Sequence, residues 1–130
     1  MLIATMNPRL HEDLFVFCTV YREPTRDELD VAAATVREAE GITLVLAEND
    51  AIAMGHRGLK PMARITLTVH SSLEAVGLTA VVASRLASSG IPCNVIAGFY
   101  HDHLFVPADL AGAAMVALTE LADPGPADPG

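Results

Sequence analysis

The chain is poor in basic residues. Its 130 residues include 8 Lys and Arg against 16 Asp and Glu, which gives a formal net charge of −8. Nucleic acids and anionic lipid surfaces attract proteins through clustered positive charge, and no cluster of Lys and Arg occurs anywhere in this sequence. We therefore expect neither a nucleic acid nor a membrane as a partner.

Long apolar runs are missing as well. No run approaches the ~20 residues that a membrane-spanning helix needs, and the N-terminus lacks the basic start and apolar block of a secretory signal. We therefore expect a cytoplasmic protein. Because 52% of the residues are hydrophobic, the chain has enough apolar material to form the core of one domain, and its length also allows two small subdomains that are not independent of each other.

Cysteine is scarce, and its placement argues against redox chemistry. The two cysteines, Cys18 and Cys93, lie in apolar, strand-like segments. They lack the CxxC spacing that is typical of redox and zinc sites. We expect both to be buried, reduced thiols.

The clearest local pattern is the segment ARITLTVHSSL at residues 63–73. Apolar and polar residues alternate in its first part, which predicts a strand with one apolar face. Ser71 and Glu74 then form the pattern of a capping box, so a helix is expected to begin there. This helix is mostly apolar and is expected to end at Gly90, since glycine adopts the left-handed conformation of a helix C-terminus easily.

This junction between strand and helix is the first candidate site. The free N–H groups at a helix N-terminus attract a carboxylate or another anion, and serine hydroxyls beside them can add hydrogen bonds. A capping box without a ligand is the alternative explanation for Ser71 and Glu74. The candidate residues of the junction are His70, Ser71, Ser72, Leu73 and Glu74.

The remaining elements follow from apolar patterning. Strands are expected at 14–20, 42–48, 92–99 and 104–106, a helical turn near 51–54 and a second amphipathic helix at 109–121. Residues 25–37 are ambiguous, because Thr25 and Glu28 can open a helix, whereas 31–37 can form a hairpin with the next strand. The tail at 123–130 is rich in proline and glycine, and we expect it not to pack.

From Ala63 onward the expected order is therefore strand, helix, strand, strand, helix. Such a unit needs one more strand to complete a split βαββαβ arrangement. That strand has to come from 14–20, from 42–48 or from another subunit.

A second group of candidate residues lies in the segment NVIAGFYHDH at 94–103. We expect the tetrad Tyr100–His103 to form the turn of a hairpin. Its histidines either line a small-molecule pocket or, together with His70, hold a zinc ion. An amide inside an apolar strand demands hydrogen-bond partners when buried. The candidate residues of this segment are Asn94, Tyr100, His101 and His103.

Two long motifs, HSSLEAVG at 70–77 and NVIAGFYHDHLFVP at 94–107, together with FVFCTV at 15–20 and EAEGITLVL at 38–46, resemble the small bacterial ACT-domain family. The resemblance covers roughly residues 6–121. It implies an α+β fold with ferredoxin-like βαββαβ units, two pseudo-repeated units that share or abut sheets, at 1–61 and 62–122. It also favours the hairpin interpretation of residues 31–46.

The resemblance also implies a function. Similar proteins bind amino acids or other small ligands at the strand-to-helix loop and at unit interfaces, and they usually associate, so we expect a homodimer. Glu40, in the charged turn at 37–41, becomes a candidate to receive a ligand ammonium group, although such a turn is otherwise just a solvated bend.

We therefore expect a regulatory protein that binds an amino acid, without catalysis and without a cofactor. Two other classes stay open. One is a metal-binding protein or hydrolase that uses His70, His101 and His103, although no GxSxG motif or phosphate loop is present. The other is an oligomerisation module without a ligand, which would show a large apolar face and no pocket.

Overall fold

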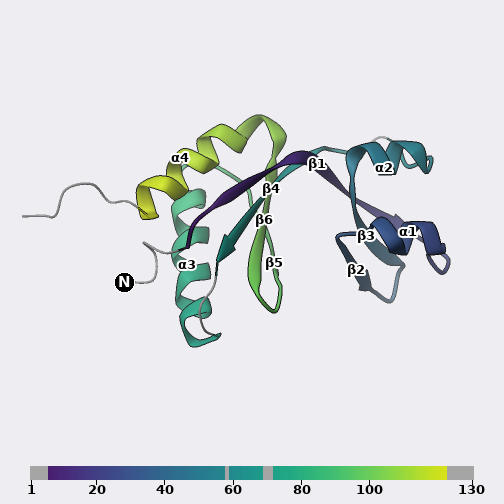
Figure 1. The fold of residues 1–130 in the computed structure, drawn as a ribbon, viewed down its shortest axis with the longest axis horizontal. Coiled ribbons are helices and arrows are strands. Elements are labelled where there is room, and N and C mark those ends of the chain that lie inside the picture. The colour runs from purple at the N-terminus through teal and green to yellow at the C-terminus, as the bar shows by residue number, and fades with distance from the viewer. Residues whose placement is uncertain (1–5, 58, 69–71, 123–130) are drawn as a thin grey trace, which may run out of the picture. The chain divides into compact units, whose positions relative to one another are not determined.

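The structure, a computed structural model, describes residues 6–57, 59–68 and 72–122, and for 72–76 and 122 it describes the backbone alone. The chain forms two compact units (Figure 1). Unit 2 is Glu12–Met62, and unit 1 combines the chain up to His11 with the chain from Ala63 onward. These units differ from the expected ones, 1–61 and 62–122, in the chain up to His11, which belongs to the same unit as the chain from Ala63 onward.

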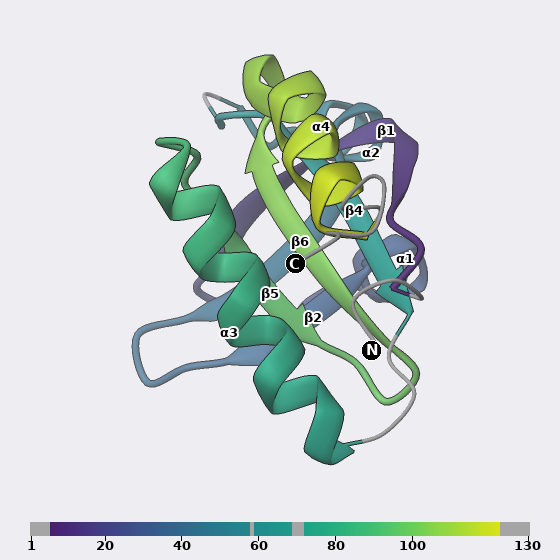
Figure 2. The same cartoon turned by 90° about the vertical axis from the view of Figure 1, so that its left-hand side faces the viewer.

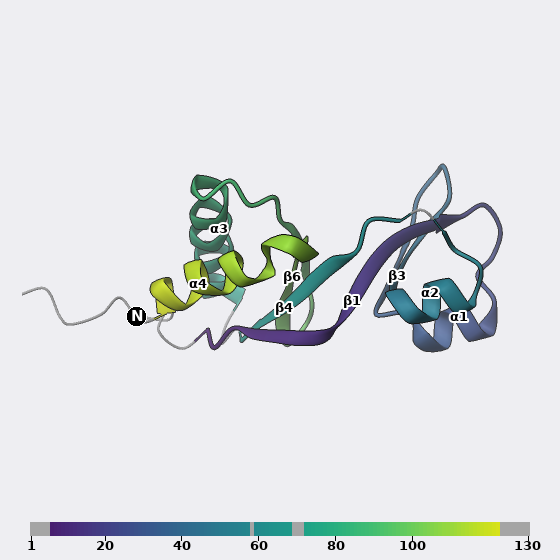
Figure 3. The same cartoon turned by 90° about the horizontal axis from the view of Figure 1, so that it is seen from above.

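Unit 2 contains a three-stranded antiparallel arrangement in the order β2-β3-β1. Phe15 pairs with Ala47 at one end of the β1–β3 ladder, and Val20 pairs with Ile42 at the other. The helices α1 and α2 lie beside each other next to these strands (Figure 3). The elements of unit 2 are β1 (Arg9–Val20), which begins in unit 1, α1 (Arg26–Val31), β2 (Ala34–Arg37), β3 (Ile42–Ala47) and α2 (Glu48–Ala53).

The core of unit 2 forms where the apolar faces of β1 and β3 meet α2. Its buried residues are Val16, Cys18, Val20, Ile42, Leu44, Leu46 and Ala51. Cys18 is a free, buried thiol, as expected, whereas the free Cys93 of unit 1 is only half-buried.

The ambiguous segment at 25–37 forms a helix and a strand in turn. Thr25 and Glu28 make a complete capping box and open α1, which ends at Val31. The strand then begins at Ala34 and pairs with β3. The expected hairpin with 42–48 is therefore confirmed, but its first strand is shorter than the expected 31–37, because α1 occupies the beginning of that segment.

Unit 1 has the strand order β1-β4-β6-β5, in which the first residues of β1 lie beside β4. The helices α3 and α4 cover one face of these strands (Figure 2). The elements that belong to this unit alone are β4 (Met62–Thr68), which starts at the boundary, α3 (Ser72–Ser88), β5 (Asn94–Ala97), β6 (His101–Pro107), a short 3-10 helix η2 (Ala108–Leu110) and α4 (Ala111–Ala122).

Alternation along β4 divides unit 1 into an apolar and a polar side. Ala63, Ile65 and Leu67 are buried, and the residues between them are half-buried. Because successive side chains of a strand point to opposite faces, the buried set faces the helices. Other buried apolar residues of unit 1 include Leu78, Val82, Leu86, Leu104, Val106, Ala114, Ala117 and Leu118.

The predicted order of strand, helix, strand, strand, helix from Ala63 onward is confirmed. The fourth strand comes from the N-terminal segment, as one of the alternatives held, but from the beginning of β1 rather than from 14–20. Gly90 follows α3 with a φ of 72°, the left-handed conformation expected of it. No helix of the described part of the chain is long and apolar enough to cross a membrane.

Candidate functional site

The predicted strand-to-helix junction is present in the backbone. β4 ends at Thr68 and the 17-residue helix α3 begins at Ser72. His70 and Ser71 lie outside the described residues. Ser72, Leu73 and Glu74 form the first turn of α3, where the structure describes the backbone alone.

Asn94 and Tyr100 both lie at the solvent-exposed hairpin of β5 and β6. Asn94 is the first residue of β5, pairs with Phe105 and is exposed. The argument that a buried amide there demands partners was therefore wrong. Tyr100 is 73% exposed, and its ring meets the ring of Phe99 edge to face, with centroids 4.9 Å apart.

His101 and His103 are strand residues rather than turn residues. The turn begins two residues earlier than predicted, at 98–100, where the N–H of Gly98 donates to the carbonyl of His101 over 2.8 Å. The predicted turn at Tyr100–His103 was wrong in this respect, because Asp102 is a buried residue of the strand β6. Its buried carboxylate accepts a 3.0 Å hydrogen bond from the hydroxyl of Thr79 on α3.

Because His101 and His103 are two residues apart in β6, their side chains lie on the same face of the sheet. They reach the face of unit 1 that α3 and α4 do not cover, and a shallow hollow of about 340 Å³ lies there. We call the residues that line it the polar face. They are Asn7, Arg9, His11, Arg64, Thr66, Thr68, His101 and His103.

A chain of hydrogen bonds runs across the polar face through Thr66. The Thr66 hydroxyl lies 2.6 Å from Nε2 of His11 and 3.0 Å from Nδ1 of His103. The Arg64 guanidinium lies 3.2 Å from the same Nδ1. Because a guanidinium can only donate, Nδ1 of His103 accepts, and the proton of the neutral ring is on Nε2.

The electrostatics of this face favour the neutral form of His103. Burial, followed by the positive charge of Arg64, lowers the pKa of His103. The pKa of Arg64 itself is lowered by burial and by the neighbouring Arg9. Arg9 and Arg64 therefore concentrate positive charge on this face of a chain whose net charge is −8. Like charges that lie close together destabilise each other.

Of the three histidines in the proposed metal site, His70 lies outside the described residues. The rings of His101 and His103 have centroids 6.4 Å apart. Within the described part of the chain, no group of three or more His, Cys, Asp or Glu side chains is arranged to hold a metal ion.

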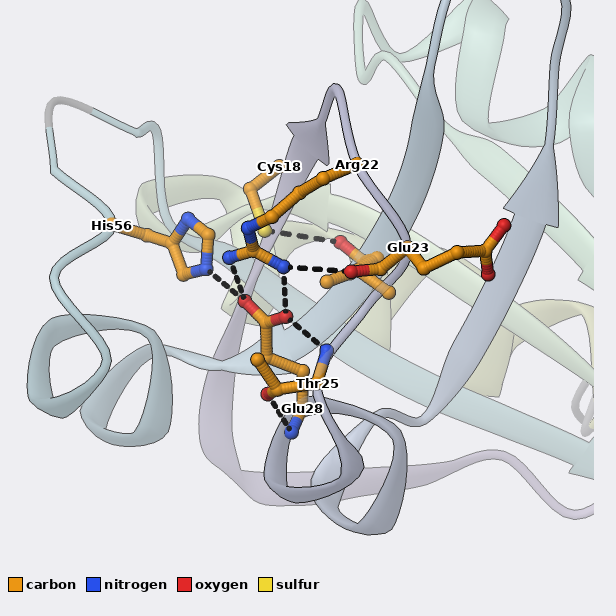
Figure 4. Close-up of polar contacts among 7 residues, drawn as sticks. Cys18, Arg22, Glu23, Thr25, Glu28 and His56 are labelled. Atoms are coloured by element: carbon orange, nitrogen blue, oxygen red, sulfur yellow. Dashed lines mark hydrogen bonds and ion pairs between the residues drawn. The ribbon is translucent and has the colours of Figure 1, made fainter.

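Unit 2 contains a second polar cluster, around the buried carboxylate of Glu28 (Figure 4). One oxygen accepts from Arg22 over 2.8 Å and from the N–H of Thr25 over 2.8 Å. The other accepts from Arg22 over 3.1 Å and lies 3.0 Å from Nε2 of His56. These donors hold the pKa of Glu28 well below its usual range, the Arg22 hydrogen bond most of all.

The Glu28 cluster is a structural feature rather than a site. Its carboxylate is 3% exposed and already accepts four hydrogen bonds, so it has little capacity left for a ligand. Glu40, by contrast, lies in the exposed turn between β2 and β3, beside an open surface hollow that also involves Arg22 and Gly41.

Six residues of the polar face were not predicted from the sequence, namely Asn7, Arg9, His11, Arg64, Thr66 and Thr68. The signal was a spacing of two. Polar residues at 9 and 11, at 64, 66 and 68, and at 101 and 103 lie on three strands. Because alternate residues of a strand share a face, such sets gather on one surface when the strands are neighbours.

Comparisons with known proteins agree with this architecture. Residues 1–63 match one family profile described as ACT domain, and residues 63–120 match a second. The chain belongs to the ACT domain family. The predicted ferredoxin-like α+β fold with two ACT-type units is thereby confirmed.

Solved structures give the same result. A Vibrio cholerae protein of unknown function, described as a possible transport protein, is 46% identical, with 93% of each chain covered and a TM-score of 0.81. An Agrobacterium tumefaciens protein is 14% identical over 88% of this chain and 87% of its own, with a TM-score of 0.74.

The ligand-free regulatory subunit of aspartate kinase from Thermus thermophilus shares the fold. It is 10% identical over 92% of this chain and 99% of its own, with a TM-score of 0.66. A search of curated proteins found no match.

Proposed function

We propose that this ACT-domain protein is a non-catalytic regulator that binds a small molecule, an amino acid in the first place, at the junction of β4 and α3. The observation that carries the proposal is that β4 ends at Thr68 and the 17-residue helix α3 begins at Ser72. Free backbone N–H groups at such a start suit an α-carboxylate.

The proposed contacts are those that the sequence suggests. The hydroxyls of Ser71 and Ser72 hold the carboxylate, and Leu73 and Glu74 belong to the same first turn. His70 and the exposed hairpin with Asn94, Tyr100, His101 and His103 contribute the walls. Glu40 remains a candidate for the ligand ammonium. The relation to a regulatory subunit of aspartate kinase supports a regulatory role.

Regulation here means occupancy rather than turnover. A bound amino acid stabilises the conformation to which it binds more tightly, and a separate target protein senses that conformation. We further propose that the protein acts in the cytoplasm and that it is a homodimer. Light scattering tests the homodimer, which should have twice the mass of the chain.

A thermal-shift screen tests the proposal. The probes are the twenty amino acids, common nucleotides and divalent metals. At a hundred times its dissociation constant, a ligand that binds only the folded state stabilises the protein by about 2.7 kcal/mol. Stabilisation by an amino acid supports the sensor, whereas stabilisation by zinc alone supports a metal protein and contradicts the proposal.

A pair of double variants locates the binding site. Ser71→Ala with Ser72→Ala removes both hydroxyls at the start of α3. The matched control, Ser88→Ala with Ser89→Ala, makes the same change at the exposed other end of that helix. We expect only the first pair to abolish the stabilisation by an amino acid. Equal stabilisation of both pairs would show that the ligand binds elsewhere.

A further inference from the structure

We propose that the polar face of unit 1 binds a small dianion, either a phosphate ester or a dicarboxylate, at a site that is centred on Arg9 and Arg64 and shares His101 and His103 with the site proposed above. The hollow of about 340 Å³ is lined by two arginines, three histidines, two threonines and an asparagine. None of the described residues that line it carries a carboxylate.

The first argument is the origin of the two arginines. Arg9 comes from β1 and Arg64 from β4, so neighbouring strands bring two guanidinium groups to one surface. They are close enough for the charge of Arg9 to lower the pKa of Arg64. An anion between them would turn this repulsion into attraction, and guanidinium groups bind both carboxylates and phosphates through paired hydrogen bonds.

The second argument is the supply of further donors. Thr68 and His101 line the same hollow, and the tautomer of His103 leaves its Nε2–H directed away from the Thr66 contact. A single carboxylate needs one guanidinium fork. Two arginines with additional hydroxyl and imidazole donors match a doubly charged group better, which is why we infer a dianion.

The proposal also predicts that the affinity for a dianion depends on pH. The titratable and charged groups on this face are the arginines 9 and 64 and the histidines 11, 101 and 103, and Asp102 lies next to them on the buried side of β6. A bound dianion would favour the protonated form of His103, because its charge opposes that of the neighbouring Arg64. Binding should therefore take up protons and become tighter as the pH falls toward the ordinary histidine pKa of ~6.5.

The test uses the full-length chain, with inorganic phosphate and succinate as probes and chloride at equal ionic strength as the reference. Calorimetry and thermal shift should show binding of at least one dianion. We expect Arg9→Gln and Arg64→Gln each to weaken that binding at least about tenfold, the usual loss for a charge-assisted contact. Whichever dianion binds more tightly identifies the source of the charge.

The control is Arg26→Gln, which removes one positive charge from an exposed position in unit 2, where Arg26 lies 4.0 Å from Asp30. Its affinity for dianions should equal that of the unaltered chain. Arg9 is exposed, so its replacement tests the site even if the half-buried Arg64 proves necessary for folding. The succinate affinity should also rise by about threefold or more between pH 8.0 and 6.5, since succinate stays ionised over that range.

Three results would overturn the proposal. The first is that neither dianion binds more tightly than chloride. The second is that all three arginine variants lose affinity equally, because binding then follows net charge alone. The third is a change of oligomeric state in Arg9→Gln without any effect of dianions, which would make the polar face a contact between subunits.

Discussion

Replacing Glu28 with glutamine should destabilise the protein by about 3 kcal/mol, because a buried acceptor is turned into a donor. The carboxylate is 3% exposed, and each of its oxygens has two donor groups within hydrogen-bond distance. Glutamine retains one oxygen. The new NH₂ group therefore faces either Arg22 with the Thr25 N–H or Arg22 with His56.

Two charge-assisted hydrogen bonds are lost in either orientation, and each contributes roughly 1.5 kcal/mol. The assay is urea unfolding followed by far-ultraviolet circular dichroism, with a melting temperature lower by on the order of 10 °C as a second measure. The matched control is Glu23→Gln. Glu23 also makes a paired contact with an arginine, Arg37, but these side chains are 74% and 64% exposed, so its loss should cost less than about 1 kcal/mol.

The pH dependence sharpens this prediction. The folded chain holds the pKa of Glu28 below the ~4.3 of an unfolded chain, chiefly through Arg22. As the pH falls, the unfolded chain therefore binds a proton at Glu28 before the folded chain does. The stabilisation by ionised Glu28 is complete above pH ~4.3 and is lost as the pH falls below it. The difference between the unaltered chain and Glu28→Gln should shrink steadily from pH 5 to pH 3. A difference that is independent of pH, or equal losses in Glu28→Gln and Glu23→Gln, would refute the reasoning.

Other variants probe unit 1 and the β2–β3 turn. Gly41→Ala places a Cβ 2.8 Å from Oγ1 of Thr19 and should destabilise by about 1–3 kcal/mol in urea, whereas Gly77→Ala in α3 meets nothing within 4 Å and should stabilise by up to ~1 kcal/mol. Thr79→Val removes a donor to the buried Asp102 and should cost about 1–3 kcal/mol. His103 has a lowered pKa, so its contribution to the free energy of unfolding is present above pH ~6.5 and is lost as the pH falls. In urea unfolding, the free energy of unfolding of His103→Asn should therefore fall less between pH 7.5 and 5.5 than that of the unaltered chain.

Local patterns predicted most of the backbone. The alternation in β4, the helix that follows it and the left-handed Gly90 each depend on neighbours in sequence, and all three appear as expected. Thr25 and Glu28 signalled a helix correctly. What local pattern could not show is that Glu28 would be buried by Arg22 and by His56, which is 28 positions away in the chain.

The polar face shows the same limit more sharply. Arg9 and His11 lie before the strand expected at 14–20, since the first residues of β1 have little apolar content, although in the structure they belong to the strand and lie beside β4. The histidines 101 and 103 were assigned to a turn because aspartate is common in turns. In the structure Asp102 is buried and bonded to Thr79, a contact with α3 that spacing alone does not reveal.

The division of β1 between the two units limits how this protein can be dissected. A fragment that starts at residue 62 would keep β4, α3, β5, β6 and α4 but would lack the strand segment beside β4. Among the lost contacts is the hydrogen bond from the N–H of Thr68 to the carbonyl of Met6. Such a truncation would uncover a bare sheet edge that invites aggregation, so an isolated C-terminal half should be produced with residues 1–11 reattached through a linker.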